Sequence, residues 1–177
     1  MVQLKLKRFL GVVLVIVAGF LLQNSILPAI RWMIYVPNIL VIIICAFGLC
    51  SGPYYGMLAG VVCGLLMDSV FGYRIGFYSL VFLYMGYLNG VCHKYFFYDN
   101  LLIPTIACGL SDFGLGCYIF VLHFLLRNRM NFRFYAMNMI LPEMVFTILT
   151  GLILFRIIIK INAKMEELEK RRSTKFV

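Results

Sequence analysis

Six apolar stretches follow one another along the chain, separated by short segments rich in glycine, proline, aromatic and basic residues. They cover residues 9–30, 37–50, 54–71, 75–92, 101–126 and 135–159. A helix needs about 20 apolar residues to cross the hydrocarbon core of a bilayer, and most of these stretches approach that length. The pattern therefore predicts an all-α integral membrane protein. Residues 1–160 would form a single domain of six transmembrane helices, and residues 161–177 a charged cytoplasmic tail.

Local signals predict how some of these helices begin and end. Ser51-Gly52-Pro53 is expected to form a tight turn, so the second and third stretches should form an antiparallel hairpin. Near the other end of the chain, Glu166 and Lys170 stand four residues apart, as do Glu167 and Arg171. Pairs of opposite charge at this spacing stabilise a helix, so the tail is expected to continue the sixth helix.

The composition supports a lipid environment. Hydrophobic residues make up 63% of the chain and charged residues 13%, whereas about a quarter of an ordinary soluble domain is charged. The formal net charge of +9 would suggest nucleic acid for a soluble protein, but eleven of the 16 Lys and Arg residues fall in the termini and in alternate loops. Because basic loops stay on the cytoplasmic side of a membrane, both termini are predicted to be cytoplasmic. No nucleic-acid partner is expected.

A four-residue repeat of small residues marks the third apolar stretch. Gly56, Gly60, Gly64, Asp68 and Gly72 recur at this spacing, and residues four apart share one face of a helix. In a membrane helix such a face lets a neighbouring helix approach closely. The four glycines are therefore predicted to pack against a partner helix, which they would bring close to Asp68.

Three acidic side chains stand inside predicted spans, where a charge is costly and points to a functional site. Asp68 and Glu143 lie toward the outer ends of the third and sixth spans, and Asp112 lies near the middle of the fifth. With Arg74 they are predicted to form an intramembrane polar cluster, in which Arg74 or an arginine of the last outer loop holds Asp68 and Glu143. Two readings stay open, a structural ion pair that fixes helix orientation and a site for a substrate or an ion.

The sequence does not indicate catalysis or a metal centre. Gly109-Leu110-Ser111-Asp112 is only faintly similar to a motif of intramembrane aspartyl proteases, because the second glycine of that motif is missing. Ser111 and His123 are twelve residues apart, about 18 Å along one helix, so they cannot act as a nucleophile and its base. The six cysteines form no Cys-x-x-Cys pair and are interpreted as small buried residues. We expect no enzyme activity, catalytic residue, metal or cofactor.

Several short motifs follow one another in a distinctive order. They are Leu22 to Pro28, Pro37 to Leu40, Gly48 to Pro53, Gly60, Gly64 to Asp68, Gly72 to Gly76 and Gly86 to Gly90, with Leu141-Pro142-Glu143 as a weaker match in the second half. In this order and spacing they resemble the MreD family of bacterial rod shape-determining proteins. The positions taken as the family motif are Pro37, Asn38, Gly52, Asp68 and Gly76.

The resemblance implies a function, a location and a set of partners. Such proteins are non-enzymatic multi-pass subunits of the cell-elongation machinery (the elongasome) in the bacterial cytoplasmic membrane, where they support peptidoglycan synthesis in the cell wall and rod cell shape. The implied direct partner is an MreC-like single-span protein, whose helix the glycine stripe would accept. MreB, RodA and its class B penicillin-binding transpeptidase are implied in the same complex. The basic tail would meet anionic lipid or a cytoplasmic partner.

The main alternative is a vitamin-binding subunit of an energy-coupling-factor transporter. That fold also has about six spans, and the MreD family is similar to it in architecture. Asp68, Arg74 and Glu143 would then contact a vitamin from outside. The first span has no sustained small-xxx-small face of the kind that such subunits use to dock to their transporter, since only Gly11 and Gly19 approach it. Likeness of fold does not decide between the two functions.

Overall fold

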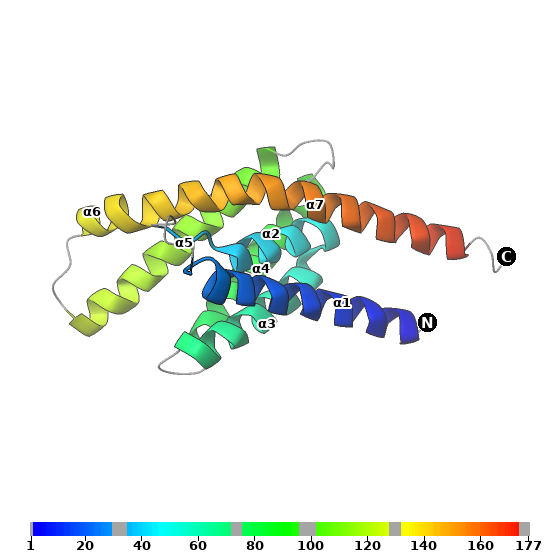
Figure 1. Ribbon diagram of the computed structural model, residues 1–177, viewed down its shortest axis with the longest axis horizontal. Coiled ribbons are helices and arrows are strands. Elements are labelled where there is room, and N and C mark those ends of the chain that lie inside the picture. The colour runs from blue at the N-terminus through cyan, green and yellow to red at the C-terminus, as the bar shows by residue number, and fades with distance from the viewer. Residues whose placement is uncertain (1, 30–34, 72–75, 96–101, 128–131, 174–177) are drawn as a thin grey trace.

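Residues 2–29, 35–71, 76–95, 102–127 and 132–173 are described by a computed structural model (Figure 1). They form helices joined by short turns, and no strand occurs among them. The elements are α1 (Val2–Leu21), the π-helix η1 (Leu22–Ile26), α2 (Ile39–Ser51), α3 (Pro53–Phe71), α4 (Phe77–Val91), the 3-10 helix η2 (Cys92–Tyr95), α5 (Leu102–Arg127), α6 (Phe132–Tyr135), the π-helix η3 (Ala136–Ile140) and α7 (Leu141–Ser173). The all-α prediction is confirmed for the described residues.

Each predicted apolar stretch coincides with one helical segment. The largest difference at a start is in the first stretch, because α1 begins at Val2 and takes in the basic residues before residue 9. At the other end of the chain, α6, η3 and α7 follow one another without a gap from Phe132 to Ser173. The predicted helical continuation of the sixth stretch into the tail is therefore confirmed as far as Ser173.

Three helices among the described residues are long and apolar enough to cross a membrane, judged by length and composition. They are Pro53–Val70, Leu102–Leu122 and Arg133–Ile158. Gly11–Ile26 and Ile39–Ser51 are apolar but shorter. These helices are compatible with insertion into a membrane.

The central helix of the fold is α2, which contacts α1, α3, α4, α5 and α7 (Figure 1). It is buried on all sides from Ile39 to Ala46, and again at Leu49 and Cys50. A helix that is hydrophobic all round is typical of such an enclosed position. Its 13 residues extend over only about 20 Å, less than the ~30 Å thickness of a hydrocarbon core. By itself α2 is therefore too short to span such a core.

A single residue, Gly52, connects α2 to α3. Its φ of 90° is in the left-handed region, which glycine adopts without steric cost. The Gly52 N–H donates to the carbonyl oxygen of Gly48 over 3.0 Å, and the Gly56 N–H donates to that of Gly52 over 3.0 Å. Pro53 opens α3, where a missing N–H has no consequence. The predicted tight turn is confirmed, and α3 packs back on α2.

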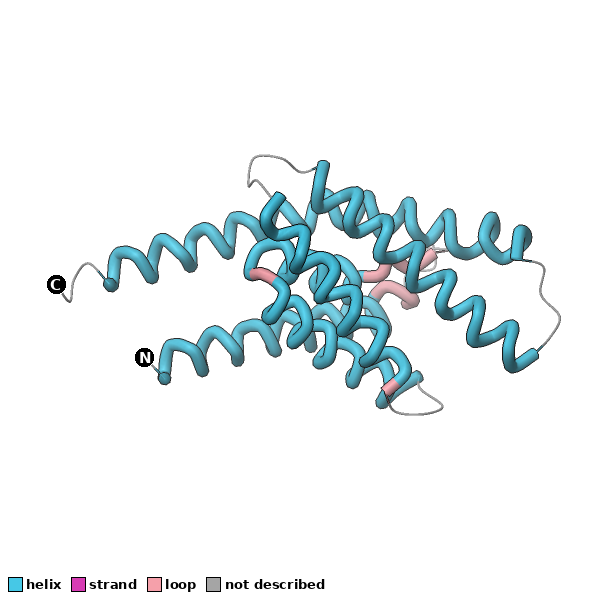
Figure 2. Tube along the Cα trace, turned by 180° about the vertical axis from the view of Figure 1, so that it is seen from behind, coloured by secondary structure: helices cyan, strands magenta, loops and turns pink. Residues whose placement is uncertain are grey.

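The first turns of α1 and the last turns of α7 leave the bundle in the same direction. Figure 1 shows both helices projecting past the others, and Figure 2 shows the same arrangement from behind. The basic sequences of the two ends therefore gather at one end of the molecule.

Candidate functional site

The glycine stripe of α3 lies directly against α4 of the same chain. A Cβ added to Gly60 would lie 2.1 Å from the carbonyl oxygen of Phe82, and one added to Gly64 would lie 2.2 Å from the Cα of Ser79. At Gly56 the nearest atom would be a backbone oxygen of α4, 2.4 Å away. Because no Cβ fits at these distances, only glycine allows so close an approach of the two backbones.

The face of α4 that meets the stripe is built in the same way. A Cβ on Gly86 would lie 2.1 Å from the carbonyl oxygen of Gly56, and one on Gly90 would lie 2.2 Å from the Cα of Pro53. Within the described residues, the helix that meets the stripe is therefore α4. This corrects the expectation that the span of another protein meets Gly56, Gly60 and Gly64. Gly72 lies outside the described residues, so its place on the stripe stays a prediction.

Asp68 ends the stripe and caps the first turn of α4. Its side chain is 2% exposed. Its Oδ2 accepts the backbone N–H groups of Gly76 over 2.9 Å and Ser79 over 3.1 Å, and its Oδ1 accepts that of Tyr78 over 3.0 Å. The first N–H groups of a helix have no partner within the helix, and the positive end of the helix dipole favours a carboxylate there. Asp68 thus fixes the turn between α3 and α4.

A second polar network is centred on Asn38, the residue before α2. The side-chain Nδ2 of Asn38 donates one hydrogen to Oδ1 of Asp112 over 2.6 Å and the other to Oε1 of Glu143 over 2.7 Å. The side-chain Oδ1 accepts from Nε2 of Gln23 over 3.2 Å, and the backbone N–H donates to Oγ1 of Thr147 over 3.0 Å. Asn38 thus ties η1, α5 and α7 to the start of α2.

Further bonds among these residues complete the network. Oε1 of Gln23 accepts the backbone N–H of Leu40 over 3.0 Å, and the hydroxyl of Thr147 donates to the carbonyl oxygen of Glu143 over 2.9 Å. In the described part of the chain, no buried side-chain nitrogen or oxygen is without a partner. This pairing is what lets polar groups stand in an apolar interior.

The network lies deep along the two longest apolar helices. Asp112 is ten residues into α5, and Glu143 is eleven residues into the helical segment that begins at Phe132, which places each roughly 15 Å from the start of its helix. The hydrogen-bond partners that the described residues supply to the two carboxyls are uncharged. In this part of the chain the two carboxyls meet the start of α2, whose helix dipole has its positive end there.

The structure brings together two of the four residues of the predicted polar cluster. Asp112 and Glu143 share Asn38, whereas Asp68 belongs to the α3–α4 turn, and no hydrogen bond joins the two sets among the described residues. Arg74 lies outside the described residues, so its predicted pairing stays a prediction. The partners found for Asp68 and Glu143 are backbone N–H groups and an amide rather than an arginine.

Gln23 and Thr147 are network residues that the sequence pattern did not single out. Thr147 follows Glu143 by four residues, so the two share a face of α7, and this spacing is the signal that could have indicated it. Gln23 is a buried polar residue in a span, but nothing in the sequence indicates that it meets Asn38.

Comparison with family models places these positions within one matched region. A family model described as rod shape-determining protein MreD matches residues 4–165. The match includes every residue of the Asn38 network and both helices of the glycine contact.

The chain belongs to the MreD family. Comparison with curated proteins and with solved structures gave no match. Membership of the MreD family implies a part in the determination of rod shape, performed by a membrane protein.

The five motif positions of this MreD-family chain can each be given a structural role. Pro37 is buried beside Asn38, the residue at the centre of the second polar network. Gly52 and Gly76 have φ angles of 90° and 112° and stand at the ends of helices. Asp68 caps the helix that follows Gly76. These five positions therefore lie at the ends of α2, α3 and α4.

Proposed function

We propose that this chain is a non-enzymatic scaffold and regulatory subunit of the bacterial elongation machinery. It sits in the cytoplasmic membrane as a six-span domain with both termini in the cytoplasm, and supports peptidoglycan synthesis and rod shape by helix–helix docking with partner proteins. The observation that carries the proposal is the family match over residues 4–165. The common direction of the ends of α1 and α7 supports the proposed topology.

The partners proposed for this role follow from the family. An MreC-like single-span protein binds directly, and MreB, RodA and its class B penicillin-binding transpeptidase belong to the same complex. The six-span architecture is proposed to be similar to that of the substrate-binding subunits of energy-coupling-factor transporters. No cofactor takes part.

The docking surface that we favour for the partner span is the outward face of α5. The stripe of α3 is filled by α4, so a partner has to use another face. On α5, Ile106 and Leu110 are 68% and 71% exposed, and a Cβ on Gly114 would meet nothing within 4 Å. These residues are four apart and share one face. Small residues on an open helix face allow close helix–helix approach in a membrane, which supports this choice.

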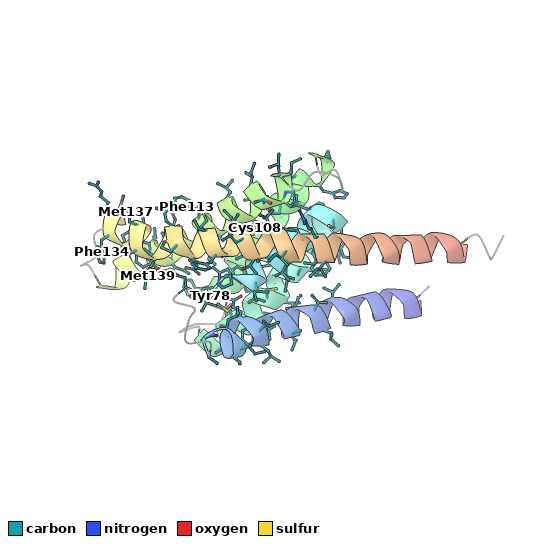
Figure 3. The ribbon with its side chains drawn as sticks, turned by 45° about the horizontal axis from the view of Figure 1, so that its top comes forward. Tyr78, Cys108, Phe113, Phe134, Met137 and Met139 are labelled. Carbon is teal, nitrogen blue, oxygen red and sulfur yellow. The ribbon has the colours of Figure 1, made fainter. Side chains whose placement is uncertain are left out.

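The exposed side chains near α6 suit a different neighbour. Figure 3 shows Phe134, Met137 and Met139 toward the end of the molecule opposite the last turns of α7, and all three are exposed. Large flexible apolar side chains of this kind pack well against lipid chains but hold a second helix away. They therefore give less support for a close helical contact than Gly114 does.

The test is a pair of matched substitutions in cells that depend on the chain. Gly114→Leu is expected to leave the amount of membrane-inserted protein unchanged, but to abolish co-purification with the MreC-like partner and to round the cells. Gly11→Leu is the control, because a Cβ there also meets nothing within 4 Å and α1 is not the proposed surface. Normal co-purification of the Gly114→Leu protein would contradict the docking surface. Depletion of the chain without loss of rod shape would contradict the function.

A further inference from the structure

Asp112 and Glu143 lie close enough for their charges to act strongly on each other. Oδ1 of Asp112 and Oε1 of Glu143 lie 2.6 and 2.7 Å from the same nitrogen of Asn38, so their separation cannot exceed these two distances together. Two carboxylates that share a site resist full ionisation. A membrane interior makes a second negative charge still more costly, because a low dielectric strengthens the repulsion.

Among the described residues, positive charge near the pair is only partial. Every packed element contributes neutral polar groups, namely Gln23 from η1, Asn38 from α2 and Thr147 from α7. The start of α2 presents the positive end of a helix dipole, equivalent to about half a charge. That is enough to favour one carboxylate and too little to balance two.

The titratable neighbours do not change this balance. Among the described residues, Tyr135 interacts electrostatically with Glu143, and Cys108 with Asp112. A phenol and a thiol are neutral or negative, so neither supplies a positive charge.

We propose that Asp112 and Glu143 hold one proton between them at neutral pH. The contact of α2 with α5 and α7 then depends on this proton, because its release places two negative charges on the two sides of the Asn38 amide nitrogen. The contact of α2 with α5 and α7 is therefore sensitive to pH. This pH dependence requires neither the proposed function nor any partner.

Infrared spectroscopy of the purified full-length protein in detergent tests this protonation state. The expected result is a protonated-carboxyl C=O band at neutral pH that shifts in deuterated water and corresponds to one carboxyl per chain. Asp112→Asn should remove the band, because Glu143 then has no second carboxyl beside it and stays ionised next to the Asn38 amide. Asp68→Asn is the matched control and should leave the band, since the carboxylate of Asp68 is held by three backbone N–H groups.

A second measurement on the same samples tests the consequence for the contact of α2 with α5 and α7. The thermal unfolding temperature of the wild-type protein should fall between neutral and alkaline pH by more than that of Asp112→Asn. Absence of the carbonyl band from the wild type would overturn the proposal without any variant. Loss of the band in Asp68→Asn, or its persistence in a folded Asp112→Asn protein, would also overturn it.

Discussion

Alanine in place of Gly60 should destabilise the protein, although alanine is the better helix former. The added Cβ would lie 2.1 Å from the carbonyl oxygen of Phe82 and 2.6 Å from its carbonyl carbon, whereas ordinary contact begins at 3.4 Å. Both atoms are backbone, so no side-chain rotation relieves the overlap, and α3 and α4 have to move apart by about 1 Å. A gap of this size removes roughly a quarter to a half of the dispersion energy between the facing atoms.

The magnitudes decide the sign of this effect. Overpacking costs about 1–3 kcal/mol, while the change from glycine to alanine in a helix gains up to about 1 kcal/mol. We therefore expect Gly60→Ala to lose about 1–2 kcal/mol of unfolding free energy. Gly114→Ala is the control, because its Cβ meets nothing within 4 Å, and it should be neutral or slightly stabilising.

Denaturant unfolding of both variants in the same detergent, followed by helical circular dichroism, compares them directly. Equal stability of Gly60→Ala and Gly114→Ala would refute the argument from close approach. So would a Gly60→Ala protein that is more stable than the wild type.

Two other substitutions and one cysteine cross-link test the remaining contacts. Asp68→Asn should lose roughly 2 kcal/mol in the same unfolding assay, because one amide oxygen cannot replace a carboxylate that accepts three N–H groups; an unchanged stability would contradict the capping role. Asn38→Leu should cost about 3 kcal/mol, since it leaves two carboxyl oxygens without their shared donor, and a smaller effect than that of Asp68→Asn would count against the central place of Asn38 in its network. Cys45 and Cys108 are both buried in the core cluster to which α2 and α5 contribute, so a chain with only these two cysteines should form an intramolecular disulfide on copper-phenanthroline oxidation, whereas one with only Cys45 and Cys117 should not.

The helices could be predicted from the sequence because their signals are local. Apolar runs of sufficient length set the segments, and Gly52 with its neighbours set the turn between α2 and α3. The Asp68 cap is also nearly local, since its partners follow within eleven residues. An acid at the end of one helix, just before the start of the next, is the signal that indicates such a cap.

The Asn38 network could not be predicted in the same way. Its members come from positions 23, 38, 112, 143 and 147, and the sequence separations of its bonds reach 109 residues. Which of several polar residues in a membrane meet one another depends on how the helices pack around α2, and that packing has no local signature. The neighbour of the glycine stripe could not be predicted from the sequence either. The four-residue spacing predicts a close helical neighbour, but not whether α4 or another protein supplies it.

The two acidic sites have a common physical origin in the ends of short helices. Asp68 meets the start of α4, and Asp112 and Glu143 face the start of α2. The helix α2 has 13 residues and is too short to cross a hydrocarbon core of ~30 Å, so a start placed inside the membrane leaves N–H groups that no water can reach. Thr147 accepts the backbone N–H of Asn38, Gln23 accepts that of Leu40, and the acids balance the dipole. If this is the reason for the acids, Glu143→Gln should be tolerated better than Asn38→Leu in the unfolding assay, because an amide still accepts from Asn38 while leucine removes the shared donor. The reverse order would mean that the negative charge itself, and not the need to satisfy the start of α2, accounts for the acids.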